Sequence, residues 1–128
     1  MNTSLILIVE DDPNSRKLLR DVLDTEGYET LETDTAEEGL RMARERVPAL
    51  ILMDIRLPGM SGIEALHALR QDVRTHAVPV VAVTASVMLA QTTQAVNAGF
   101  DALAHKPVNV TALLGTIRGL LDRHSQTA

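Results

Sequence analysis

Several short apolar runs in this sequence are directly followed by side chains that could carry chemistry. If the runs are strands of one parallel sheet, their carboxyl ends meet at one edge, which is where ligands of such sheets bind. Carboxylates gathered at that edge would repel one another unless a cation lies among them. Oxygen ligands with water in the remaining positions are typical of Mg²⁺, so the sequence predicts a magnesium site. The side chains in question are the carboxylates of Glu10, Asp11 and Asp54, the hydroxyl of Thr84 and the ammonium group of Lys106.

A carboxylate beside a bound cation can also act as a nucleophile towards a phosphoryl group. In that chemistry Asp54 would become an aspartyl phosphate, and the metal ion would neutralise charge. Lys106 would offer a second cation to the phosphoryl oxygens, and Thr84 would offer a hydroxyl donor. Phosphoryl transfer onto Asp54 is thus one of three chemistries that could use these residues.

Two other chemistries would use a similar part of such a sheet. A haloacid-dehalogenase-type phosphatase also has an aspartate nucleophile after a strand, but it needs a second aspartate two positions later, where this chain has Arg56. A nucleotide-binding domain would need a glycine-rich phosphate loop, and neither G-x-G-x-x-G nor G-x-x-x-x-G-K-[ST] occurs. Gly59 and Gly62 belong to a loop without either spacing. Both alternatives therefore lack a residue pattern that they require.

The elements that must position these side chains alternate along the chain. Short apolar runs predict strands, and the longer amphipathic stretches between them predict helices. Runs without polar alternation are typical of strands buried on both faces of a parallel sheet, so helices must cover both sides. Five such units with short connections predict an open α/β fold with right-handed crossovers. The predicted strands are 5–9, 29–32, 50–53, 80–83 and 102–104, and the predicted helices are 13–25, 36–47, one from about 62, 87–98 and one from about 109.

Capping residues mark the ends of the first two helices. Asp12 followed by Pro13 is typical of an N-cap with proline at the first helical position, so we interpret Asp12 as a cap and not as a metal ligand. Thr35 has a glutamate three positions later, which is capping-box spacing. The apolar stripe of this second helix is predicted to extend to Val47, and Pro48 is predicted to end it.

Composition excludes several classes of protein. The chain has 128 residues, 45% of them hydrophobic and 23% charged, which is typical of one globular domain. The absence of cysteine excludes disulfide scaffolds, cysteine-bound zinc and thiol nucleophiles. A net charge of −5 and a single Tyr and Phe argue against nucleic-acid binding. Without a long apolar run or a signal peptide at the start, we expect a cytoplasmic protein that does not insert into a membrane.

Four segments closely resemble the response-regulator receiver domains of two-component signalling. They are VEDD at 9–12, LMDIRLPGMSG at 52–62, VVAVTA at 80–85 and KP at 106–107, and together they extend over nearly the whole chain in order. The resemblance implies a flavodoxin-like (βα)₅ fold, a doubly wound five-stranded parallel sheet with strand order 2-1-3-4-5. It implies one bacterial receiver domain over residues 1–128, of the stand-alone DivK-like or CheY-like type, and we expect no output domain.

The resemblance also assigns roles to residues of this sequence. It makes Asp54 the phosphoacceptor, Thr84 the switch hydroxyl and Lys106 the cation that contacts the phosphoryl group. It implies Mg²⁺ as the cofactor, bound directly by Asp11 and through water by Glu10, which stands where the family more commonly has aspartate. The side chain of Arg56 is either solvated or placed against the phosphoryl group. The full set of metal-binding residues that the resemblance implies is Glu10, Asp11, Asp54 and the backbone carbonyl of Arg56.

The resemblance finally implies the partners. A sensor histidine kinase or a histidine phosphotransfer protein would donate the phosphoryl group, and the receiver would be a switch that assists its own phosphorylation and dephosphorylation, not an enzyme. The alternative is a pseudo-receiver that binds its partner without phosphorylation.

Receivers usually have Tyr or Phe three positions before the lysine, where this chain has Leu103, and residues 75–100 contain no Asp, Glu, Lys or Arg. A neutral helix face suits partner docking, because interface cores are depleted in charge. We therefore expect the downstream protein to bind the helix at 87–98, the fifth strand and the fifth helix.

Overall fold

A five-stranded parallel sheet forms the centre of the computed structural model, which describes residues 4–85 and 97–125. The spatial order is β2-β1-β3-β4-β5, as the resemblance implied. Each strand begins at the predicted residue and ends no more than one residue beyond its predicted end. The strands are β1 (Leu5–Val9), β2 (Glu29–Thr33), β3 (Leu50–Asp54), β4 (Val80–Thr84) and β5 (Ala102–His105).

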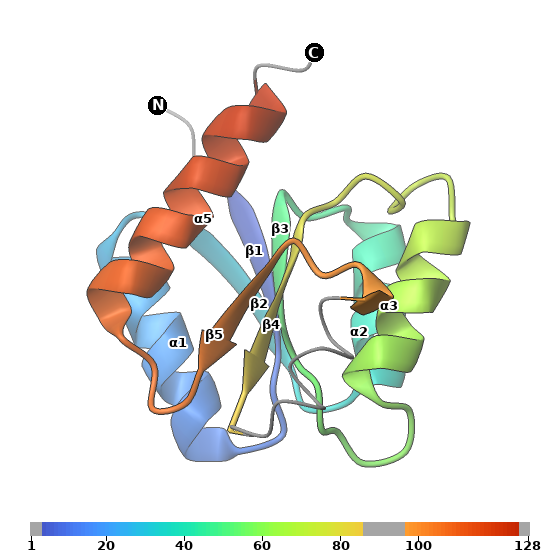
Figure 1. The fold of residues 1–128 in the computed structure, drawn as a ribbon, viewed down its shortest axis with the longest axis horizontal. Helices are drawn as coiled ribbons and strands as arrows, with labels where there is room; N and C mark the ends of the chain where they lie inside the picture. Colours follow the sequence, from blue (N-terminus) through green and yellow to red (C-terminus); the bar gives the residue numbers. More distant parts are fainter. Residues whose placement is uncertain (1–3, 86–96, 126–128) are drawn as a thin grey trace.

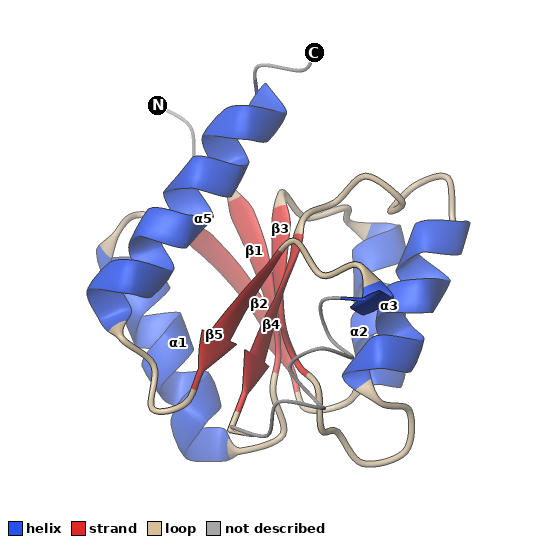
Figure 2. Ribbon diagram, viewed as in Figure 1, coloured by secondary structure: helices blue, strands red, loops and turns tan. Residues whose placement is uncertain are grey.

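Helices cover both faces of this sheet (Figure 1, Figure 2). Helices α1 (Pro13–Thr25) and α5 (Val110–Ser125) lie on one face. Helices α2 (Ala36–Glu45) and α3 (Gly62–Gln71) lie on the other. Of the predicted helix at 87–98, residues 97 and 98 are helical, and the rest lies outside the described residues.

Hydrophobic packing forms one core layer on each face of the sheet. One layer joins alternate β1 and β3 residues such as Leu7 and Ile51 to α2 and α3. The other joins their neighbours, such as Ile8 and Leu52, to α1 and α5. Every residue of β1, β3 and β4 is buried, as their continuous apolar runs predicted. The strands that carry or directly precede Glu10, Asp54 and Thr84 are therefore fixed by packing on both faces.

The capping predictions are confirmed at the starts of α1 and α2, but the predicted end of α2 is wrong. Asp12 accepts a hydrogen bond from the backbone N–H of Asn14, and Thr35 accepts one from that of Glu38. Helix α2 ends at Glu45, and Val47 is 46% exposed instead of lying on the buried stripe. The cause is steric, because the proline that follows Val47 disfavours helical geometry in the preceding residue, and the chain becomes extended before it.

In the part of the chain that the structure describes, no helix combines the length and apolar character needed to cross a membrane.

Candidate functional site

The carboxylates of Glu10, Asp11 and Asp54 form a cluster at the carboxyl edge of the sheet. Strands β1 and β3 are neighbours, and their register pairs Val9 with Met53, so the residues that follow lie side by side. One carboxylate oxygen from each acid lies within 4.8 Å of the others. Glu10 and Asp54 are only 1% and 6% exposed, whereas Asp11 is exposed. The structure thus brings together the three acids that the strand ends suggested.

Lys106 lies between two of these acids. Its Nζ is 2.5 Å from Oε1 of Glu10 and 3.1 Å from Oδ2 of Asp54. The sheet sets this position, because Lys106 follows β5 directly and its backbone N–H donates to the carbonyl of Thr84 at 2.8 Å. Thr84 itself is buried at the end of β4. All five candidate residues therefore lie at the ends of four adjacent strands.

Burial and ion pairing within the cluster shift the pKa of two groups. Burial raises the pKa of Glu10 to about 6, against the effect of Lys106 and of a backbone N–H donated by Asp12. Burial alone would lower the pKa of Lys106, but its contacts with Glu10 and Asp54 raise it. Since the folded chain holds the Glu10 proton more tightly than the unfolded chain, the stability that this proton contributes is lost as the pH rises through about 6.

The residues present fit a magnesium ion. Three carboxylates and one ammonium group leave a net negative charge that a divalent cation would balance. Among the described residues, the buried Oε1 of Glu10 accepts no hydrogen bond, and its contact with Lys106 is an ion pair. Oxygen donors at a partly exposed edge, where water can complete the coordination, are typical of Mg²⁺ sites.

Arg56 lies in the loop between β3 and α3. Its backbone N–H donates to Oδ1 of Asp54 at 3.0 Å, which orients the carboxylate, while its side chain is exposed. The metal-binding role of its carbonyl stays a prediction.

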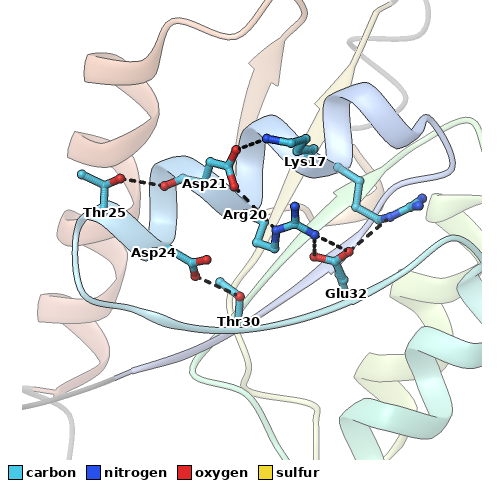
Figure 3. Close-up of polar contacts among 8 residues, drawn as sticks. Lys17, Arg20, Asp21, Asp24, Thr25, Thr30 and Glu32 are labelled. Carbon is cyan, nitrogen blue, oxygen red and sulfur yellow. Dashed lines mark hydrogen bonds and ion pairs between the residues drawn. The ribbon is translucent and has the colours of Figure 1, made fainter.

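Sequence reasoning missed Arg16, which supports the acidic turn from α1. Its Nη1 donates to the backbone carbonyl of Glu10 at 2.9 Å, and its Nε lies 3.6 Å from Glu32. Arg20 also donates to both carboxylate oxygens of Glu32, at 3.1 and 3.2 Å (Figure 3). Figure 3 shows how this contact continues along α1 to Asp21 and Lys17. No spacing in the sequence signals the bond from Arg16 to Glu10, because it joins a helix side chain to a backbone atom six residues earlier.

Comparison with known proteins agrees with this geometry. The family description "Response regulator receiver domain" matches residues 6–118. The polar-differentiation response regulator DivK of Brucella ovis is 40% identical over 119 residues, which cover 93% of this chain and 97% of that protein.

Two solved structures share the fold. A CheY-like response regulator receiver domain protein from Methanospirillum hungatei JF-1 has a TM-score of 0.90 at 34% identity, and the match covers 99% of this chain and 100% of that one. The receiver domain of a sensor histidine kinase from Pseudomonas aeruginosa PAO1 has a TM-score of 0.88 at 26% identity, with 94% and 99% covered, and it has a magnesium ion coordinated in its active-site cleft. The chain therefore belongs to the response regulator receiver domain family, whose role lies in two-component signalling.

Proposed function

We propose that this receiver is a phosphoacceptor in which Asp54 takes a phosphoryl group from a sensor histidine kinase or a histidine phosphotransfer protein. The observation that carries the proposal is the placement of Asp54 beside both Lys106 and the acidic pair of Glu10 and Asp11. A buried carboxylate with a cation on one side and further carboxylates on the other is suited to nucleophilic attack on a phosphoryl group beside a metal ion.

Each residue has a defined task in this reaction. An oxygen of Asp54 attacks phosphorus and forms the acyl phosphate bond, while the bond from phosphorus to the donor imidazole nitrogen breaks. The backbone N–H of Arg56 holds the other carboxylate oxygen. Lys106, already 3.1 Å from Asp54, interacts with the phosphoryl oxygens, and Thr84 supplies a hydroxyl from the end of the adjacent strand.

The same proposal includes a bound Mg²⁺. Asp11, Asp54 and the carbonyl of Arg56 would bind it directly, and Glu10 would bind it through water. The ion supplies charge neutralisation between the carboxylates and the incoming phosphoryl group. The magnesium ion in the active-site cleft of the Pseudomonas receiver supports this assignment.

Phosphoryl incorporation tests the function. Purified protein is incubated with radiolabelled acetyl phosphate, with Mg²⁺ or with a chelator. We expect acid-stable, alkali-labile label on the chain with Mg²⁺ only, as for an acyl phosphate formed beside a metal ion. A chain that takes no label from acetyl phosphate or from a histidine kinase, yet still binds its partner, would instead be a pseudo-receiver that signals by constitutive binding.

The output is a change in protein binding and not catalytic turnover. Phosphorylation adds charge at the carboxyl edge of the sheet and shifts the receiver towards a state that its downstream partner prefers. A single receiver domain over residues 1–128 is part of this proposal. The 97% coverage of the DivK relative supports it.

We place the downstream partner on the predicted helix at 87–98, β5 and α5. The first of these lies largely outside the described residues, so the support there is its lack of charged residues. Among the described residues, the support is a hollow of about 290 Å³ between β5 and α5. Its lining includes Leu103, at the position where receivers usually have an aromatic residue, together with Ala112 and Thr116.

A charge on this surface should weaken partner binding. For Ala112→Glu, at an exposed position of α5, we expect a lower affinity of the phosphorylated protein for its downstream partner and unchanged labelling by acetyl phosphate, because interface cores exclude charge. Gln94→Glu should act in the same way. Val73→Glu, at an 85% exposed position in the α3–β4 connection, is the matched control. If Ala112→Glu and Gln94→Glu bind the partner with the same affinity as Val73→Glu and the wild-type protein, the docking surface lies elsewhere.

A further inference from the structure

The start of α3 lies directly against the backbone of the phosphoacceptor. The first residue of this helix is Gly62, which is buried, and its backbone N–H donates to the carbonyl of Ile55 at 2.9 Å. A Cβ atom at position 62 would lie 2.3 Å from the carbonyl oxygen of Asp54 and 2.8 Å from Cα of Ile55. Non-bonded atoms do not approach so closely, so any side chain at this position requires the backbone to move.

The need for glycine here is spatial and not conformational. The described glycines with positive φ are Gly27, Gly59 and Gly99, and Gly62 is not among them. Its backbone geometry is therefore open to any residue, and only the contact with Asp54 and Ile55 excludes a side chain. The atoms in the way are backbone atoms, which cannot rotate aside as a flexible side chain can.

From this contact we propose that Gly62 is a positioning residue for the phosphoacceptor and metal site. Its missing side chain lets α3 pack against the Asp54–Ile55 peptide, and this packing sets the course of the loop that follows Asp54. The inference rests on the proposed function, because it assigns to Gly62 the geometry of that same site.

The surrounding contacts determine which part would move if Gly62 carried a side chain. Asp54 is paired with Val83 of β4, and the residue before it, Met53, is paired with Val9 of β1, so the sheet holds this end of β3. The start of α3 is held by a capping box, in which Ser61 and Glu64 exchange side-chain and backbone hydrogen bonds of 3.2 Å. Between these two fixed points lies the loop that contains Arg56. The strain of an added Cβ is therefore transmitted to this loop.

That loop contributes to the site through Arg56. Its backbone N–H holds Oδ1 of Asp54 at 3.0 Å, and its carbonyl is the proposed metal ligand. A displaced loop would turn the Asp54 carboxylate and move the carbonyl together. Groups that orient metal ligands without binding the metal typically contribute about 10- to 100-fold to metal affinity.

Two other glycines provide matched controls. A Cβ at Gly39, on α2, would lie 2.9 Å from Cγ2 of Val9, which is a core side chain and not the backbone of the site. A Cβ at Gly115, on α5, would meet nothing within 4 Å. Gly39→Ala thus crowds a core side chain and not the Asp54–Ile55 backbone, and Gly115→Ala is expected to stabilise the helix because alanine favours helical backbone more than glycine does.

The experiment compares Gly62→Ala with Gly39→Ala, both made in the Gly115→Ala background so that a loss of stability does not unfold the protein. Binding of Mg²⁺ alone is measured by calorimetry, the melting temperature by circular dichroism, and the amide resonance of Arg56 by NMR without metal. For Gly62→Ala we expect Mg²⁺ affinity to fall about tenfold or more and the Arg56 amide resonance to shift. For Gly39→Ala we expect the affinity and the resonance of the background, even if the melting temperature falls equally.

Each outcome decides between the two proposals. Unchanged Mg²⁺ affinity in Gly62→Ala overturns the positioning role, whatever its melting temperature. If Gly62→Ala fails to fold while Gly39→Ala folds, the contact is structural and the positioning role is also overturned. If the background protein itself neither binds Mg²⁺ nor takes label from acetyl phosphate, the proposed function fails, which is a separate result.

Discussion

Asp54→Asn is expected to abolish labelling by acetyl phosphate and to leave the fold intact. The amide has nearly the shape of the carboxylate, and its Oδ1 can still accept the backbone N–H of Arg56, as Asp54 does at 3.0 Å. It lacks the anionic oxygen that attacks phosphorus, so label should fall to background. Radiolabel incorporation and the far-UV circular dichroism spectrum measure the two effects.

Asp12→Asn is the matched control for this change. Asp12 lies two residues after Glu10 but is exposed and caps α1, and asparagine is an equally good N-cap. We expect Asp12→Asn to be labelled at the wild-type rate. Labelling of Asp54→Asn at that same rate would refute Asp54 as the acceptor.

Lys106→Ala is expected to separate phosphorylation from its effect on partner binding. The variant should still take label from acetyl phosphate, more slowly, because Asp54 and the acidic pair remain. The variant lacks the ammonium group that lies 3.1 Å from Asp54 and that would contact the phosphoryl oxygens. The affinity of the downstream partner should therefore be the same before and after phosphorylation, which means that the coupling free energy is lost. Titration of the partner against both forms measures this coupling.

The same substitution should also destabilise the metal-free protein. Removal of Lys106 leaves Glu10, 1% exposed, without its cation, and a broken buried ion pair typically costs about 3 kcal/mol or more of unfolding free energy. Lys106→Met keeps most of the side-chain packing and is the control for lost volume. Full wild-type gain of partner affinity in phosphorylated Lys106→Ala would exclude Lys106 from the switch.

The strands could be predicted from sequence because their physical cause is local. Three strands are buried on both faces, and a continuous apolar run in the sequence predicts such burial. They are Leu5–Val9, Leu50–Asp54 and Val80–Thr84. The gathering of Glu10 and Asp54 followed in turn from the parallel sheet, since adjacent strands end at one edge. The order of the strands came from the resemblance.

The errors and omissions concern contacts that no periodic pattern encodes. The predicted end of α2 was wrong because the apolar spacing continued to Val47, although the proline after it favours an extended chain. The bond from Arg16 to the carbonyl of Glu10 and the approach of Gly62 to Asp54 depend on how α1 and α3 pack on the sheet. Such contacts join side chains or Cα positions to backbone atoms, and the sequence specifies them only through the complete fold.

The parallel sheet also determines where a label or a tether can be attached to this receiver. Strand β1 begins, and α5 ends, at the opposite edge of the sheet from Asp54 (Figure 1). There Ser4 and Leu121 line one hollow together with Ala49 and Pro79, which directly precede β3 and β4. A fluorescent label or a surface tether joined before β1 or after α5 would leave the edge of the sheet that carries Asp54 uncovered. Immobilised receivers could therefore be phosphorylated on a sensor chip and probed for partners in the same orientation.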